Sequence, residues 1–118
     1  MRTLRLLVAL TAVASLGGCV SSPPMARHLP YDIRGADSEF ARRLKARFPD
    51  GSSSAQMIRA LTAEGFRPTA AHSAGPSTHV YVYERDALIC SFAWNVFWLT
   101  DEEDRVSDVS GTYDTICL

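Results

Sequence analysis

The sequence 89-ICSFAWNVFWL-99 decides the fold. It contains no glycine, proline or charged residue, and it is rich in the aromatic and β-branched side chains that favour β-strands. Alternate residues point to opposite faces of a strand. One face carries Cys90, Phe92, Trp94, Val96 and Trp98, and the other carries Ser91, Ala93, Asn95, Phe97 and Leu99. We therefore predict a strand over 89–99 whose Trp-bearing face belongs to the core, with a ligand platform as the alternative for that face.

Two further stretches predict strands on either side of this one. Residues 78–85 (THVYVYER) alternate valines with tyrosines, the pattern of a half-buried strand. Residues 105–113 follow an acidic turn, 101–104, and predict the return strand. Together they predict a three-stranded antiparallel β-meander. Residues 67–77, rich in Ala, Pro, Gly and Ser, predict a loop.

Two cysteines indicate the register of the last hairpin. If paired positions sum to 207, Cys90 faces Cys117, and a disulfide closes the hairpin. The same register produces an aromatic ladder, with Trp94 opposite Tyr113, Val96 opposite Gly111 and Trp98 opposite Val109. A sum of 205 keeps the faces but separates the sulfurs by one step. The alternatives to a disulfide are two free buried thiols or a catalytic cysteine, for which no neighbouring base is evident.

The first of two predicted helices precedes the strands. Asp37 is placed to cap it, and Phe40, Ala41, Leu44 and Phe48 form one apolar stripe. Pro49 ends it.

The second helix begins at Ser53, which forms a capping box with Gln56. Met57, Ile58 and Leu61 would be buried, and Gly65-Phe66 has the pattern of a glycine-terminated helix end. The predicted fold class is α+β, in which the two short helices pack on the three-stranded antiparallel meander after a cleaved signal peptide. The predicted domain spans 37–118.

The N-terminus has the pattern of an export signal. Arg2 and Arg5 precede an uncharged apolar run, 6–16, which is too short to span a bilayer. The following Leu16-Gly17-Gly18-Cys19 resembles the bacterial lipobox. That resemblance implies cleavage after residue 18, a diacylglyceryl thioether on Cys19 and acylation of the new amine.

The resemblance to a lipobox also implies where the chain is located. Val20, rather than Asp, follows the cysteine, which by the enterobacterial sorting rule favours the outer membrane. Residues 19–36 contain several prolines and serines and predict a flexible tether, with the domain facing the periplasm.

Charge and motifs exclude several classes of function. The net charge is −1, and loss of residues 1–18, which contain Arg2, Arg5 and no acidic residue, makes it −3. We therefore expect no nucleic-acid partner. The basic run 42–47 predicts a solvated helix face, with a phosphate or lipid-headgroup patch as the alternative. The histidines, His28, His72 and His79, lack metal-ligand spacing, and 101–104 lacks the spacing of a calcium loop.

No catalytic or nucleotide-binding motif is present in the sequence, so we expect a protein that is not an enzyme and has no cofactor or metal. Two short helices cannot cover both faces of the sheet. We therefore expect a partner surface among Tyr81, Tyr83, Phe97 and Leu99, with either the tyrosines or the other two residues exposed.

The order of these elements resembles small outer-membrane lipoproteins of the BamE (SmpA/OmlA) type. The resemblance spans 37–117 and rests on Gly51-Ser52-Ser53, Glu64-Gly65-Phe66 and Trp94-Asn95-Val96-Phe97-Trp98. The Leu-Gly-x-Pro helix ending of that family is absent, so no binding residues are transferred.

These observations lead to a functional hypothesis. We expect a membrane-anchored, non-enzymatic accessory protein that binds an envelope protein during outer-membrane assembly or maintenance. The alternative is a periplasmic inhibitor or ligand-binding module, for example against a cell-wall hydrolase.

Overall fold

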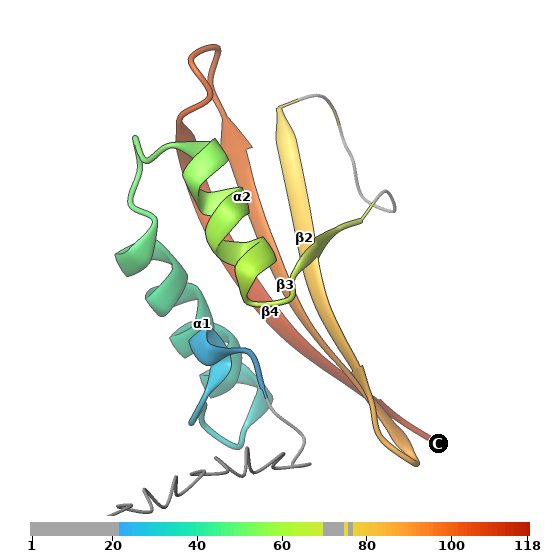
Figure 1. Cartoon of the computed structure of the whole chain (residues 1–118). Helices are drawn as coiled ribbons and strands as arrows, with labels where there is room; N and C mark the ends of the chain where they lie inside the picture. The colour runs from blue at the N-terminus through green and yellow to red at the C-terminus, as the bar shows by residue number, and fades with distance from the viewer. Residues whose placement is uncertain (1–21, 70–74, 76) are drawn as a thin grey trace, which may run out of the picture.

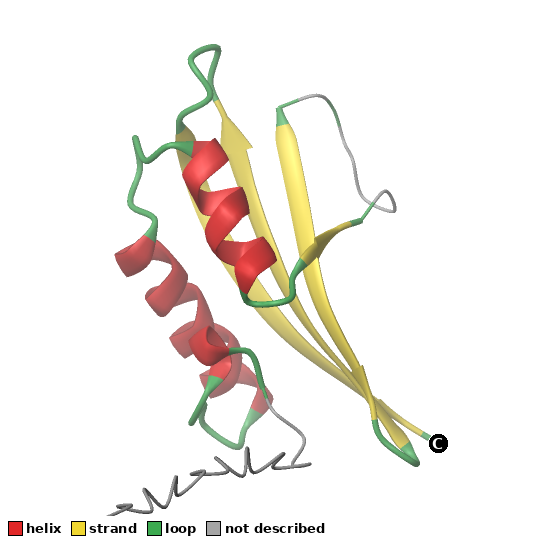
Figure 2. Ribbon diagram, in the orientation of Figure 1, coloured by secondary structure: helices red, strands yellow, loops and turns green. Residues whose placement is uncertain are grey.

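The computed structural model describes residues 22–69, 75 and 77–118. The predicted signal peptide, Cys19 and His72 lie outside this set. Figures 1 and 2 show two helices on one side of an antiparallel sheet, so the α+β class is confirmed. The elements are η1 (Pro24–Ala26), α1 (Ile33–Arg47), α2 (Ser54–Ala63), β1 (Arg67–Pro68), β2 (Thr78–Asp86), β3 (Cys90–Thr100) and β4 (Val106–Cys117).

The sheet has four strands in the order β1-β2-β3-β4, so the prediction of three strands is wrong. The additional strand, β1, lies in the segment that we predicted to be a loop. Arg67 pairs with Val82, Pro68 pairs with Tyr81, and Thr69 N donates to Val80 O at 3.1 Å. A strand of two residues has no alternation to detect, and proline is tolerated there because β1 lies at the sheet edge.

The predicted pairing of β3 with β4 is confirmed over most of its length. Cys90 pairs with Cys117 and forms the disulfide, and the Trp94–Tyr113 and Val96–Gly111 pairs are present. The Trp98–Val109 pair is wrong, because the register shifts between Phe97 and Leu99, and Leu99 pairs with Ser107. Asp108 has a left-handed backbone, with φ 49°, at this irregularity. One extra residue in β4 is the usual origin of such a shift.

The first helix begins earlier than predicted. Asp32, not Asp37, caps α1: its Oδ2 accepts from Gly35 N at 2.7 Å. Asp37 therefore lies inside the helix and is free to contact the sheet. The helix packs on β4 at Gly111, where an added Cβ would lie 2.5 Å from Leu44 Cδ1 and 2.8 Å from Phe40 Cδ1. This glycine allows the helix to approach the strand closely.

The second helix has the predicted ends. Ser53 Oγ accepts from Gln56 N at 3.3 Å. At the other end, Phe66 N donates to Leu61 O at 3.0 Å and Gly65, with φ 96°, donates to Thr62 O at 3.1 Å. These two bonds are the Schellman pattern of a glycine-terminated helix. Between helix and sheet, Trp98 Nε1 donates to the buried Ser54 Oγ at 3.0 Å.

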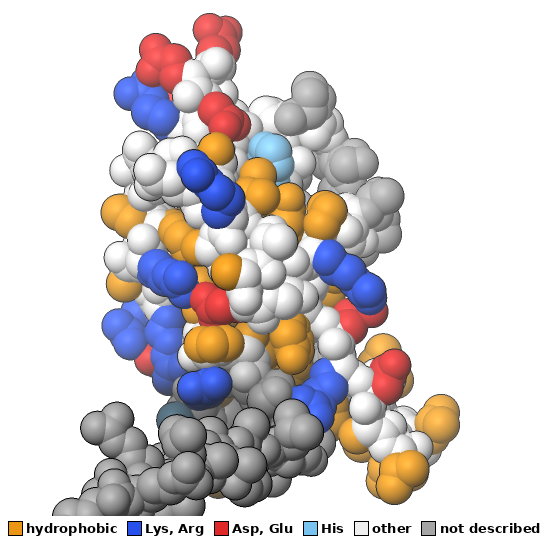
Figure 3. Space-filling view, viewed as in Figure 1, with side chains coloured by type: hydrophobic (Ala, Val, Ile, Leu, Met, Phe, Trp, Pro, Cys, Tyr) orange, Lys and Arg blue, Asp and Glu red, His pale blue; other side chains and the backbone are white. Residues whose placement is uncertain are grey.

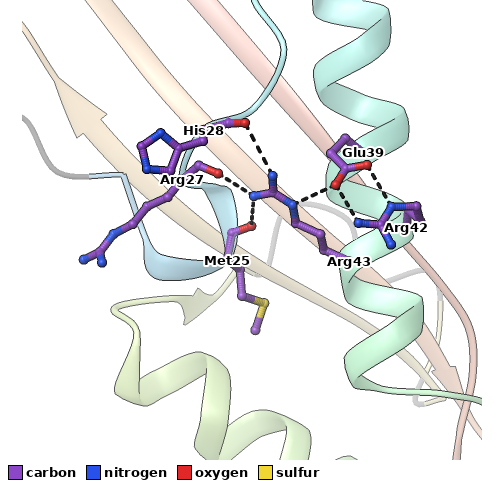
Figure 4. Close-up of polar contacts among 6 residues, drawn as sticks. All are labelled: Met25, Arg27, His28, Glu39, Arg42 and Arg43. Atoms are coloured by element: carbon purple, nitrogen blue, oxygen red, sulfur yellow. Dashed lines mark hydrogen bonds and ion pairs between the residues drawn. The ribbon is translucent and has the colours of Figure 1, made fainter.

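Part of the segment that we predicted to be a tether is packed on the domain. Met25 and Ala26 of η1 are buried in the core. Figure 4 shows the reason: Arg43 Nη1 donates to the carbonyls of Met25 at 3.2 Å and Arg27 at 2.5 Å, and Nη2 donates to that of His28 at 3.4 Å. Met25 N in turn donates to Glu64 Oε1 at 2.9 Å. A guanidinium with several donors can bind a turn of free carbonyls in this way.

Candidate interaction surface

The predicted partner surface divides between the two faces of the sheet. In the β2–β3 register, Tyr81 lies opposite Val96 and Tyr83 lies opposite Trp94. Both tyrosines therefore share the face that the helices cover. Phe97 and Leu99 have the other parity and lie on the opposite face, which we call the open face. The four residues do not form one continuous surface.

The two tyrosines belong to the core. Tyr81 is 9% exposed, and its ring lies 5.3 Å from that of Trp98. Tyr83 is half-buried between Phe66, at 5.7 Å, and Trp94, at 5.6 Å. The helices thus cover Tyr81 and Tyr83. Of the two alternatives, only Phe97 and Leu99 lie on the face that the helices leave uncovered.

The open face is apolar toward the β3–β4 hairpin and polar further along. Leu99 is 39% exposed and Phe97 is half-buried beside Val80, its β2 partner. Further along, Asn95 Nδ2 donates to Asp114 Oδ2 at 3.0 Å, and Arg67 forms an ion pair with Glu84 at 2.8 Å. Neither described helix lies over this face (Figure 2). An exposed apolar area of this kind, next to polar pairs, is a candidate for contact with a protein.

A second exposed apolar group lies at the other end of the sheet. Leu88 is 102% exposed, Ile89 65%, Ile116 72% and Leu118 105%, and we call these four residues the apolar tip. The β2–β3 turn is closed by Ala87 N donating to Cys90 O at 2.7 Å, and Leu118 N donates to Ile89 O at 2.8 Å. Sequence reasoning missed this group, although Leu88-Ile89 stands between two strands where turn residues are usual.

The acidic turn 101–104 forms the hairpin between β3 and β4. Asp101 Oδ1 accepts from the N–H groups of Glu103 and Arg105, both at 2.9 Å, and Arg105 forms ion pairs with Asp101 and Glu103. The backbone hydrogen bond from Arg105 is the main reason that the pKa of Asp101 lies below its usual value. The contacts of Asp101 and Glu103 with Arg105 therefore fix the conformation of the turn.

The basic run 42–47 is occupied by local ion pairs. Glu39 binds Arg42 at 2.7 Å and Arg43 at 3.0 Å, and Arg47 binds Glu64 at 2.5 Å. Hydrogen bonds from Arg42 and then Arg43 lower the pKa of Glu39 to about 2. These contacts favour the solvated-face interpretation of the run over a phosphate patch.

A cavity of about 500 Å³ lies between the N-terminal segment and the sheet. Trp94 and Tyr113 line it from the sheet, and Ser22, Ala26 and Ala36 are among the residues on its other side. The Trp94 ring is 5% exposed, and its Nε1 has no hydrogen-bond partner within the described part of the chain. This Nε1 is itself buried, so among these residues it is an unpaired donor inside the protein and not a group presented to the cavity.

The remaining candidates for chemistry have structural roles. His79 stacks on Trp98 at 5.1 Å, and its Nε2 lies 3.2 Å from Thr100 Oγ1. Cys90 and Cys117 are joined, so neither sulfur is a free nucleophile. Among residues 22–69, 75 and 77–118, no group of three or more His, Cys, Asp and Glu side chains is arranged to hold a metal.

Over the same described ranges, no helix has the length and apolar character to cross a bilayer.

Comparisons with known proteins add no family. The chain matches no protein-family model, no curated protein and no solved structure.

Proposed function

We propose that this chain is a lipid-anchored accessory protein of the bacterial cell envelope. In this proposal Cys19 carries the lipid in the outer membrane, the domain faces the periplasm, and the open face binds an envelope protein. Involvement in outer-membrane assembly or maintenance follows from the resemblance to BamE-type lipoproteins and is part of the same proposal.

The lipobox carries the proposal. Leu16-Gly17-Gly18-Cys19 stands immediately after an apolar run that follows two arginines, which is the context that lipoprotein processing requires. Two or three acyl chains on one residue give stable anchoring, since each buried methylene contributes about 0.8 kcal/mol. The Cys90–Cys117 disulfide supports export, because such bonds persist in the periplasm and are rare in the cytosol.

The open face supports a protein partner. Leu99 is 39% exposed and Phe97 is half-buried, whereas Val80, the partner of Phe97, is buried. The polar pairs Asn95–Asp114 and Arg67–Glu84 lie further along the same face. An exposed apolar area next to paired polar side chains supports a contact with a protein.

Co-purification from detergent-solubilised membranes tests the proposal. We expect a stoichiometric envelope protein to co-purify with the wild type and not with Leu99→Lys. The lysine would bring an unpaired charge into the apolar area formed by Leu99 and Phe97 when the partner covers it. Thr62→Lys, on the exposed side of α2, is the control and should retain the protein. Equal retention by both variants, or no specific envelope protein at all, would contradict this part of the proposal.

The alternative function is a periplasmic inhibitor or ligand-binding module. The ordered acidic turn, with Asp101 held by two backbone N–H groups, favours approach to a basic enzyme. Inhibition of a lysozyme-type hydrolase that disappears with Glu102→Gln/Glu103→Gln would select this alternative.

A further inference from the structure

We propose that the apolar tip, Leu88, Ile89, Ile116 and Leu118, enters the surface of the lipid bilayer beside the anchor. The inference rests on the proposed lipidation of Cys19 and goes beyond it, because it gives the domain a fixed orientation on the membrane. The occupant of the tip is lipid, not a protein or a second copy of the chain.

The composition of the tip fits a lipid surface. Its four large side chains are between 65% and 105% exposed, whereas Leu44, Met57 and Leu61, which are of similar size, are fully buried in the core. No charged side chain occurs in 87–91 or 115–118. Figure 3 shows a group of hydrophobic side chains at the lower right of the molecule, with charged side chains just above them, and a group of acidic side chains at the upper end. The tip can therefore enter an interface without carrying any of its own side chains into it in charged form.

The tip is held rigid before it meets any partner. It combines the β2–β3 turn with the end of β4, two segments joined by the Cys90–Cys117 disulfide and by the Leu118–Ile89 hydrogen bond. Hairpin turns usually carry Gly, Asn or Asp. Leu88 and Ile89 at this turn expose apolar surface that the fold itself does not use. A pre-formed apolar end loses little conformational entropy when it is buried.

The position of the N-terminal segment favours lipid as the partner of the apolar tip. Figure 1 shows η1 and the beginning of α1 at the same end of the sheet as the β2–β3 turn. Ser22 lines a cavity with Trp94 and Tyr113, and Cys19 precedes Ser22 by three residues, a reach of at most about 11 Å. Along β3, Trp94 lies four residues from Cys90, or about 13 Å. An acylated Cys19 would thus hold the tip close to the same bilayer surface.

The binding of the N-terminal segment to the domain limits how far the tip can move from the membrane. Arg43 binds the carbonyls of Met25, Arg27 and His28, so the free length between Cys19 and the domain is shorter than 19–36. The acidic turn 101–104 then points away from the bilayer, where it avoids repulsion by anionic headgroups.

Depth-dependent fluorescence quenching tests the inference on the full lipidated chain. Leu88→Trp places a reporter at the tip, and Glu102→Trp places a matched reporter at the opposite hairpin. The native Trp94 and Trp98 are 5% and 1% exposed, so their signal is subtracted with the wild type. Each protein is reconstituted in phosphatidylcholine vesicles containing a brominated analogue, with and without phosphatidylglycerol. Intact mass first establishes whether Cys19 is acylated.

We expect the Leu88→Trp signal to shift to the blue and to be quenched by bromine, with little dependence on phosphatidylglycerol, while Glu102→Trp remains that of a hydrated indole. Adding Ile89→Ser and Ile116→Ser should return the tip reporter toward the hydrated signal. An acylated protein whose tip reporter is not quenched would overturn the inference and leave the anchor intact. A blue shift that needs no vesicles would overturn it in favour of a second copy or a protein. An unacylated Cys19 would instead refute the proposed function on which it rests.

Discussion

Asp37 Oδ1 accepts a hydrogen bond from the backbone N–H of Tyr113 at 2.6 Å, across 76 residues of sequence. β4 is the last strand of the sheet, so outward N–H groups along it have no neighbouring strand to bind. The Asp37 carboxylate satisfies one of them. Near the other end of β4, Val106 N donates to Ser52 O at 2.7 Å and Gly51 N donates to Val106 O at 2.8 Å. The edge is thus protected at both places against pairing with another chain.

Replacing Asp37 by alanine should lower the free energy of unfolding by about 1–3 kcal/mol, because a strand N–H loses a charged acceptor. Urea denaturation of the purified chain measures this. Asp37→Asn retains an acceptor oxygen and should lose less. Equal losses in the two variants would show that the side-chain oxygen is not the important feature.

Gly111→Ala should also destabilise the fold, since the new Cβ would lie 2.5 Å from Leu44 Cδ1. Overpacking of this kind costs about 1–3 kcal/mol. In a double-mutant cycle, Leu44→Ala removes the shorter of the two close contacts and leaves the one with Phe40 Cδ1 at 2.8 Å, so the double variant should be less destabilised than the sum of the single ones. Simple additivity would contradict the contact.

Arg43→Ala should release the N-terminal segment from the domain, because it removes the donors to the carbonyls of Met25, Arg27 and His28. Limited trypsin digestion followed by mass spectrometry should then show faster cleavage after Arg27. Arg42→Ala is the matched control: it also loses a bond to Glu39 but has no described bond to the segment. Similar cleavage rates in both variants would argue against the role of Arg43.

The pH dependence of stability should include a contribution from Glu39, whose pKa is lowered from 4.5 to about 2 by its bonds to Arg42 and Arg43. A lowered pKa means that the folded state favours the ionised form, so the stabilisation is complete above about pH 4.5 and is lost as the pH falls toward 2. The difference in unfolding free energy between wild type and Glu39→Gln should therefore shrink in this window. A constant difference from pH 6 to about 2 would contradict the assignment.

The parts of the fold that could be predicted from the sequence are those set by patterns among neighbouring residues. Alternation along 89–99 gave the core face, the positions of Cys90 and Cys117 gave the register, and Gly65 gave the end of α2. The bulge at Asp108 escaped prediction because a single left-handed residue leaves no mark on the hydrophobic pattern.

The features that sequence did not predict depend on partners far along the chain. Asp37 is a residue type that commonly caps helices. Only the position of β4 shows that it instead accepts a hydrogen bond from Tyr113 N. Residues 19–36 were predicted to be a flexible tether because proline-rich segments usually lack partners. In the structure, Arg43 donates hydrogen bonds to three carbonyl groups of this segment. The apolar tip was missed because Ile89 was predicted to be the first residue of a strand and Leu88 was assigned to no element.

The proposed function depends first on the lipid at Cys19, which intact mass spectrometry of the protein purified from bacterial membranes would detect. We predict a mature chain that begins at Cys19 and carries a diacylglyceryl group with a further acyl chain, and a Cys19→Ala variant that lacks both. A membrane-extracted or secreted chain cleaved elsewhere, with an unmodified Cys19, would contradict the account.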